Sequence, residues 1–366
     1  MTRKTKQAET DEVSAAYHEA LMQIGATTTA DALALWAGVP ADVRAATAGG
    51  WLRKAITLVM SRRRQSRDLA RAYYRLARAL QTGSTVADPY HPEPDHVTLA
   101  DLRQQFAELA GTYEPPVDPP SDSPPADESK KPASTSQDET LQSDDPSTVP
   151  VDPADDEEDD DWDRILVEEL EGLREEEERV ERQAEEELRI VLEALGTSNL
   201  DRRMTVEDAD PDDAHRQAGA QQAAAASRVA MNGGRSSNWT HMSRDRRALG
   251  YVRLSRTGTP CGWCAMLISR GPVYKSEKSA LFNDGDKYHD HCHCYAMPVW
   301  NRDQYQSSEL TALSRQYEAL WPKVTKGHTG KDAVTVWRRF IRARQREAKQ
   351  AAAQEARRPT DTALEA

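Results

Sequence analysis

The sequence predicts a mainly α-helical protein with a small α+β module toward the C-terminus and a long disordered acidic linker before it. Three observations support this fold class. Apolar residues recur at helical spacing through most of the chain, a tract rich in Pro and Asp interrupts them, and two short strand-like segments flank a cluster of cysteines and histidines. With 30% charged and only 6% aromatic residues, the 366-residue chain has the composition of a globular protein diluted by solvated segments.

Residues 1–111 are predicted to form an N-terminal helical domain. Val13, Tyr17, Leu21 and Ile24 follow one another at intervals of three or four residues, which places them on one helix face. The threonines at 27–29 suit the start of a second helix. The glycine pair at 49–50 is expected to break the helical pattern again before the segment 51–80.

An arginine-rich stretch lies within that last segment. Two interpretations are open: a basic surface for a nucleic acid or an acidic partner, or the solvated face of an ordinary amphipathic helix, which we favour. The arginines concerned are Arg62, Arg63, Arg64, Arg67, Arg71, Arg75 and Arg78.

Residues 112–161 are predicted to be a disordered acidic, Pro-rich linker. Half of the chain's 20 prolines lie here, and such a composition buries too little apolar surface to offset the chain entropy. Residues 113–164 carry 18 acidic and three basic side chains, a charge of −15, so the rest of the chain is close to neutral although the net charge is −13. The acidity argues against non-specific binding of duplex nucleic acid by the whole chain, because phosphates would be repelled.

A long charged helix is predicted over 162–196. Its apolar residues recur at roughly heptad spacing, although the pattern skips a position at Glu177. A coiled coil with itself or with a partner is one interpretation, and a single long helix packed at its two ends is the other. Gly196 suits the C-terminal end of this helix.

The segment 197–348 is predicted to form the C-terminal module, with a frayed tail over 349–366. A helix is expected over 213–231, ended by the Asn-Gly-Gly sequence at 232–234. "LGYVRLSRTG" predicts a short strand with Tyr251 and Arg253 facing outward and Val252 and Leu254 inward, and "AMPVW" predicts a second strand. Two further helices are expected in "SSELTALSRQYEALWPKV" and "TGKDAVTVWRRFIRARQREAKQ".

All four cysteines of the chain fall in this module, together with interleaved histidines. "PCGWC" provides a C-x-x-C pair, and "YHDHCHC" provides H-x-x-C-x-C about 27 residues later. Zn²⁺ prefers four thiolate or imidazole ligands in a tetrahedron, and a C-x-x-C turn directs two thiolates toward one point. We therefore predict a metal-clipped module with a structural zinc site. The candidate ligands, of which four would suffice, are Cys261, Cys264, His289, Cys292 and Cys294.

Other interpretations of the cluster remain open. The cysteines can be buried free thiols beside surface histidines, or Cys261 and Cys264 can form a redox pair. A zinc deaminase would need an H-x-E motif, and His91–Glu93 is too far upstream and interrupted by proline. An HNH-type nuclease would need further residues downstream of "YHDH" that are not recognisable here.

The N-terminus has no apolar run after its basic start, and no stretch approaches the length of a membrane helix. We therefore expect no secretory signal, no membrane contact and synthesis in a reducing cytoplasm. In that compartment clustered cysteines more often bind metal or catalyse than form disulfides.

The module resembles the C-terminal part of phage Mu F-like minor head proteins, and more closely the VG15-like minor capsid or capsid maturation type of actinobacterial phages. The resemblance rests on C-x-x-C, "SRG-x-x-Y" and H-x-x-C-x-C, and on "TKGHTGKDAVTVWRRFIR" downstream. In this chain the motif residues are Cys261, Cys264, Ser269, Arg270, Gly271, Tyr274, His289, Cys292 and Cys294.

The resemblance implies a virion protein acting in head assembly near the portal, present in the host cytoplasm during assembly. The implied partners are the phage portal protein and the major capsid or scaffolding protein. Some members are described as proteases, but Ser269 has no recognisable base or orienting group, so protease activity is kept only as an alternative. Two interpretations are open for the arginines beside Trp337 and Phe340: contact with packaged DNA, or the outer face of an amphipathic helix. These arginines are Arg338, Arg339, Arg342, Arg344 and Arg346.

Overall fold

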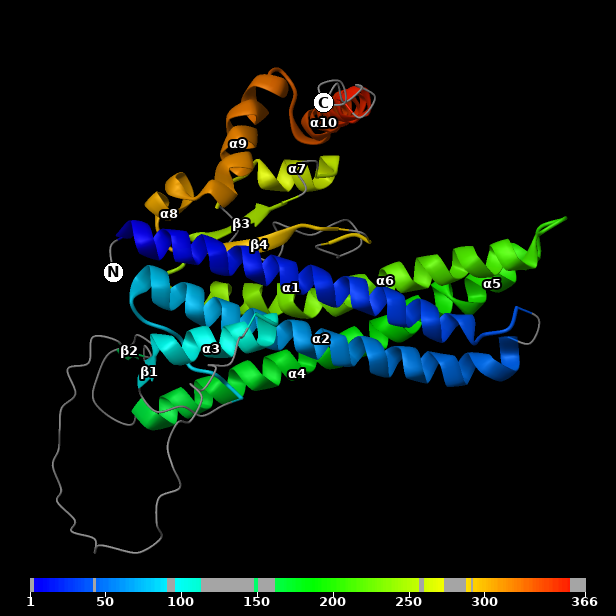
Figure 1. Ribbon diagram of the computed structural model, residues 1–366, viewed down its shortest axis with the longest axis horizontal. Coiled ribbons are helices and arrows are strands. Elements are labelled where there is room, and N and C mark those ends of the chain that lie inside the picture. The colour runs from blue at the N-terminus through cyan, green and yellow to red at the C-terminus, as the bar shows by residue number, and fades with distance from the viewer. Residues whose placement is uncertain are drawn as a thin grey trace, which may run out of the picture.

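The structure is a computed structural model that describes residues 3–41, 44–90, 96–112, 148–150, 162–256, 260–272, 288–290 and 292–355 (Figure 1). Over these residues it confirms a mainly α-helical protein with small β-sheets. None of the described helices is both long and apolar enough to cross a membrane.

Four long helices lie side by side and form a bundle (Figure 1). They are α1 (Arg3–Ala37), α2 (Arg44–Thr82), α4 (Trp162–Leu195) and α6 (Pro211–Arg244). The shorter α3 (Leu99–Ala110) packs on α2, and α5 (Thr197–Met204) packs between α4 and α6. Helices α6 and α2 each contact all three other long helices, so together they form the centre of the bundle.

The helix breaks that the sequence suggested in the N-terminal region are not present. Helix α1 continues through the threonines, where the hydroxyls of Thr28 and Thr29 donate to the carbonyls of Ile24 and Gly25 one turn earlier. Helix α2 continues through the glycine pair at 49–50. Packing in the bundle keeps each of the two helices continuous across residues that would favour a helix end in an isolated peptide.

The C-terminal part contains both predicted strands. Strands β3 (Gly250–Leu254) and β4 (Tyr295–Val299) pair antiparallel, with Val252 opposite Met297. Around them lie α7 (Gly262–Ile268), α8 (Arg302–Ser307), the 3-10 helix η2 (Glu309–Thr311), α9 (Ala312–Val324) and α10 (Gly330–Glu355). The predicted outward face of β3 is wrong, because all five of its residues are buried and Arg253 is only 2% exposed.

The predicted linker and tail lie mostly outside the described residues. Within 112–161 a short strand, β2 (Thr148–Pro150), pairs antiparallel with β1 (His96–Thr98), so these three residues are ordered rather than disordered as predicted. Within the predicted tail, residues 349–355 continue α10. The remaining domain limits stay predictions. The described parts of 1–111 and 197–348 nevertheless share one hydrophobic core, which includes Tyr17, Tyr73 and Tyr295.

The arginines of α2 are mostly interior, which matches neither interpretation of the basic stretch. Arg71, Arg75 and Arg78 are at most 5% exposed. Arg71 pairs with Asp88 at 3.2 Å, and Arg78 pairs with Asp245 at 2.9 Å. Burial alone would raise the pKa of Asp245, but hydrogen bonds from Arg78 and Trp300 outweigh it and lower that pKa.

Helix α4 packs on α2 and α6 of its own chain along the apolar seam seen in the sequence. Leu188 and Leu192 are fully buried in this contact. The skipped position, Glu177, is 5% exposed and lies 3.8 Å from Arg67 and 3.7 Å from Arg71. An ionic contact therefore replaces the missing apolar one. A coiled coil with another chain stays a prediction.

The helix expected to end at 232–234 instead continues to Arg244. Gly233 and Gly234 face α2, and a Cβ on Gly234 would lie 2.5 Å from the carbonyl oxygen of Ser66. The backbone N–H of Gly234 also donates to Ser66 Oγ at 2.9 Å. The glycines therefore serve close helix packing, not helix termination.

This contact predicts that Gly234→Ala destabilises the protein by about 1–3 kcal/mol, because the added methyl group must push the α2 backbone away. Gly172→Ala is the matched control, since that helical glycine has open space around it. The control should instead stabilise by about 0.5–1 kcal/mol. Urea unfolding of the full chain measures both, and a stabilising Gly234→Ala would contradict the close contact.

Candidate metal centre

The candidate ligands come from two segments that the fold brings together. Cys261 caps the N-terminus of α7, where its sulfur accepts a hydrogen bond from the backbone N–H of Cys264 at 3.4 Å. Cys264 lies in the first turn of α7. His289, Cys292 and Cys294 lead into β4. The C-x-x-C pair is therefore presented by a helix start, and the second group by the approach to a strand.

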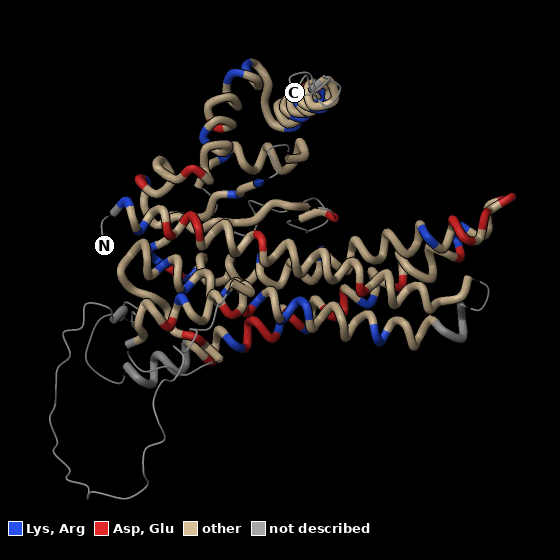
Figure 2. The backbone as a smooth tube through the Cα atoms, in the orientation of Figure 1, with Lys and Arg blue, Asp and Glu red and all other residues tan. Residues whose placement is uncertain are grey.

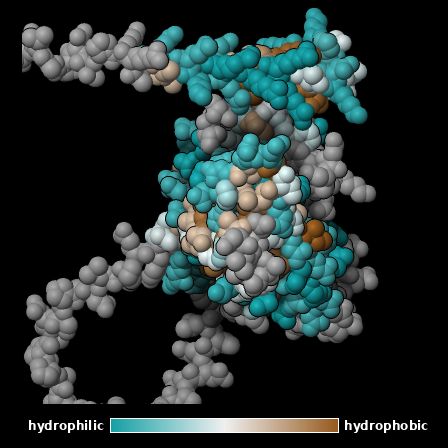
Figure 3. All heavy atoms as spheres, turned by 90° about the vertical axis from the view of Figure 1, so that its right-hand side faces the viewer, coloured by the Kyte–Doolittle hydropathy of each residue, from teal (hydrophilic) through white to brown (hydrophobic). Residues whose placement is uncertain are grey.

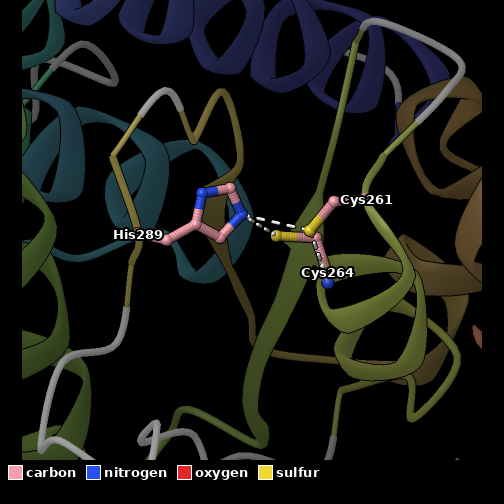
Figure 4. A group of neighbouring side chains, drawn as sticks. All are labelled: Cys261, Cys264 and His289. Atoms are coloured by element: carbon pink, nitrogen blue, oxygen red, sulfur yellow. Dashed lines mark hydrogen bonds between the residues drawn. The ribbon is translucent and has the colours of Figure 1, made fainter. Parts of the chain in front are cut away.

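All five predicted ligands belong to this cluster. Figure 4 shows the His289 ring pointing at two sulfurs, with Nε2 at 3.0 Å from Cys261 Sγ and 3.6 Å from Cys264 Sγ. The sulfurs of Cys264 and Cys292 are 3.6 Å apart. Ligands around one tetrahedral zinc lie about 3.5–3.8 Å from one another, as follows from zinc–ligand bonds of about 2.0–2.3 Å. The two separations of 3.6 Å fit that arrangement, whereas the 3.0 Å contact between Cys261 and His289 is the length of a hydrogen bond between them.

The five donors form two overlapping groups, each with its ligand atoms within 4.8 Å of one another. One contains Cys261, Cys264 and His289, and the other contains Cys264, Cys292 and Cys294. Cys264 belongs to both, so its sulfur lies at the centre of the cluster. Cys264, Cys292 and Cys294 are buried, while Cys261 is half-buried.

The orientation of His289 suits a ligand. Its Nδ1 lies 2.6 Å from the carbonyl oxygen of Asp290, so Nδ1–H donates there and Nε2 is left toward the thiols. The Asp290 carboxylate accepts from Arg228 at 2.7 Å. A nuclease histidine would instead have to activate water beside an open metal position, and His289 faces sulfurs.

The donors also perturb one another's protonation. A hydrogen bond from Cys264, together with one from His289, lowers the pKa of Cys261 to about 4. The same contact with Cys261 raises the pKa of His289 to about 9. The pKa of Cys264 is raised by the hydrogen bonds that its thiol makes with the other three cysteines. A metal ion can bind closely spaced thiols of this kind by displacing the protons that they share.

Helix α6 fixes the second half of the cluster through three side chains that lie on one face of the helix. Arg228 pairs with Asp290 as above, Arg235 donates to the carbonyl of Cys292 at 2.7 Å, and Asn238 donates to the carbonyl of Ala296 at 2.9 Å. Sequence reasoning missed these residues. Their spacing of seven and three on a long helix was the available signal.

A second feature missed from the sequence is a stack of cations on Tyr288, next to His289. The guanidinium of Arg235 lies 4.1 Å from the centre of the Tyr288 ring, and that of Arg253 lies 3.9 Å from it. All three side chains are at most 5% exposed. The buried positive charge beside the cysteines complements thiolates, and it explains why Arg253 is found inside the sheet region.

Of the residues named for enzymatic alternatives, Ser269 lies in the described part of the chain, and its hydroxyl is not free to act as a nucleophile. The hydroxyl of Ser269 donates to the carbonyl of Met266 at 2.8 Å, in the last turn of α7, and its side chain is buried. It thus acts as a helix-end hydrogen-bond donor. His91, Glu93, Tyr274 and His291 lie outside the described residues.

Comparison with known families agrees with the expected resemblance in part. The model of the VG15 protein family, which is phage-associated, matches residues 200–320, a span that contains the whole cysteine–histidine cluster and both strands β3 and β4. No curated protein and no solved structure matches the chain. The broader Mu F-like minor head assignment stays a prediction.

The geometry predicts that His289→Ala lowers zinc affinity more than about 100-fold, which exceeds the usual loss of an outer hydrogen-bond partner. His293→Ala is the matched control, because its side chain is exposed and only its backbone carbonyl is used, by His18. Competition with a chromophoric chelator measures both affinities. Equal affinities for the two variants would remove His289 from the ligand set.

Proposed function

We propose that this chain is a phage minor capsid protein that acts in head assembly near the portal, and that structural zinc holds its C-terminal module. The observation that carries the proposal is the VG15 family match over 200–320, which spans the cluster. The proposed partners are the portal protein and the major capsid or scaffolding protein, and the proposed location is the virion head.

The donor chemistry favours a structural role for the metal. A catalytic zinc keeps one position open for water, whereas a structural zinc is closed by four protein ligands. Here the cluster offers five donors, and three of the four cysteines are buried. The ligand set comes from these five donors: Cys264 belongs to both groups, Cys261 and His289 to one, and Cys292 and Cys294 to the other.

A structural metal would also stabilise the small sheet of the C-terminal module. The clip joins α7 to β4 across residues 273–287, which lie outside the described part of the chain. The sheet that these elements cover has only two strands, and such a pair is marginal on its own. A cross-link between α7 and the approach to β4 would thus add to the hydrophobic contacts that hold this small sheet in the core.

Capsid maturation protease is the alternative function, and its candidate nucleophile is Ser269. The buried hydroxyl of Ser269 donates to a backbone carbonyl, so the protease alternative is not favoured. We propose no hydrolytic step.

The test replaces Cys264 by Ser and Ser269 by Ala in phage that supply this chain. Cys264→Ser should abolish zinc binding, lower the melting temperature and remove the chain from purified heads, because the central sulfur is lost. Ser269→Ala should cost about 1 kcal/mol of stability and leave capsid-protein cleavage unchanged. Mass spectrometry of purified heads and gels of the capsid protein give both readouts. Loss of cleavage with Ser269→Ala would establish the protease instead, and absence of the wild-type chain from heads would refute the virion assignment.

A further inference from the structure

Helix α10 carries a basic stripe along one side. Lys331, Arg338, Arg342, Arg346 and Lys349 are separated by seven, four, four and three residues, which aligns them on one face of a helix. Arg339 lies beside this row. From Lys331 to Lys349 the helix rises about 27 Å. No acidic residue falls within the row of five, since helical spacing places Asp332 about 100° and Glu347 about 160° around the helix from Lys331.

These cations differ from the arginines of α2. Arg63, Arg71 and Arg78 of α2 each form an ion pair with a carboxylate of another segment. Among the described residues, no ion pair involves Arg339, Arg342, Arg346 or Lys349, and all four side chains are exposed. The stripe is therefore positive charge that the described part of the chain leaves uncompensated.

The first half of α10 is firmly attached to the metal-binding module. Trp337 is fully buried, and the Arg338 guanidinium lies 5.5 Å from the ring centre of Trp263. A side-chain amide of Gln345 donates to the carbonyl of Pro260 at 2.8 Å, directly before Cys261. The first half of α10 thus packs against α7 and the residues just before it, the same segment that provides Cys261 and Cys264.

The second half of α10 extends away from the body of the molecule, with hydrophilic side chains around it (Figure 3). After Ile341, the only apolar residues of the helix are alanines. Protein interfaces draw most of their affinity from buried aromatic and large apolar side chains. The second half of α10 has no aromatic or large apolar side chain, so it is suited to a partner that is bound through its charge.

We propose that α10 is a duplex DNA-binding helix whose basic stripe contacts the phosphate backbone. An α-helix of about 10–12 Å diameter enters the major groove of B-form DNA, which is about 12 Å wide. The deep, narrow major groove of A-form RNA does not admit a helix. The alanines at 343, 348 and 351–353 add little width to the helix. Binding is non-specific in sequence, because phosphate contacts position a protein without reading bases.

The charge distribution of the molecule favours this end for DNA. Figure 2 shows that α4, with many acidic positions along its backbone, lies at the bottom of the molecule, whereas α10 lies at the top. The overall charge of −13 argues against binding by the whole chain, as the sequence indicated, but it does not prevent binding by a projecting basic element. This inference does not depend on the metal or on the phage assignment.

The experiment measures binding of the full-length chain to a fluorescent 20-bp DNA duplex by anisotropy between 50 and 200 mM NaCl. The test variant combines Arg339→Gln, Arg342→Gln and Arg346→Gln, and the matched control combines Arg179→Gln, Arg182→Gln and Arg189→Gln. The control arginines are also exposed on a helix, α4, and their replacement changes the charge equally. Gln and Arg have similar helix propensities, so both variants should fold, as circular dichroism will check.

The wild-type chain and the α4 variant should bind DNA alike. The α10 variant should bind about tenfold more weakly or worse at 50 mM NaCl, and its salt slope should fall by about 2.7, or about 0.9 for each lost phosphate contact. Equal weakening of both variants, or no binding by the wild-type chain at 50 mM NaCl, would overturn the proposal. Tighter binding of duplex RNA or of poly-glutamate than of DNA would assign the stripe to that class of partner instead.

Discussion

The close contact between α6 and α2 is the constraint on which the rest of the structure depends. At Gly233 and Gly234 the two backbones approach to a distance that leaves no room for a side chain. Small residues precede the glycines on the same helix, with Ala223, Ala226 and Ala230 fully buried. Helix α6 can therefore lie at the centre of the bundle, in contact with α1, α2 and α4 at once. Small side chains allow the two backbones to approach closely, and the many van der Waals contacts along the two helices then stabilise the bundle.

A central α6 also explains why the metal cluster is placed where it is. The face that carries Arg228, Arg235 and Asn238 holds the residues around Cys292 by hydrogen bonds to two backbone carbonyls and one carboxylate. Helix α1 adds a contact to the same segment, between His18 Nε2 and the carbonyl of His293 at 2.9 Å. Burial lowers the pKa of His18, so this contact is made by a neutral imidazole that donates its N–H. The bundle thus supports one half of the cluster, and α7 supplies the other half.

Sequence reasoning found the elements of the fold better than their limits and surroundings. Helical periodicity located the long helices, the two strands were recognised by composition, and the Cys/His spacing identified all five clustered donors. The ends of α1, α2 and α6 were wrong because threonine and glycine favour helix ends only where packing does not decide otherwise. The burial of Arg78 was also hidden, since its partner Asp245 lies 167 residues away. Local patterns carry no information about such distant pairs. The spacing of Arg228, Arg235 and Asn238 places them on one face of α6, but it does not say that this face lies beside the cysteines.

The fate of the arginines shows how the same residue type acquires opposite roles. In α2 the guanidiniums of Arg63, Arg71, Arg75 and Arg78 are buried, and each costs desolvation energy that a well-placed carboxylate offsets. Asp88, Glu177 and Asp245 arrive from three separate segments to supply that compensation, so the ionic contacts specify how α4 and the turn after α6 dock onto the bundle. In α10 the exposed arginines remain hydrated and need no internal partner. Because a bare helix of this composition is only marginally stable in water, its firm base on Trp337 keeps the charged stripe presented. Positive charge that is compensated inside the bundle thus builds the fold, while positive charge that is displayed on α10 remains available for an external polyanion.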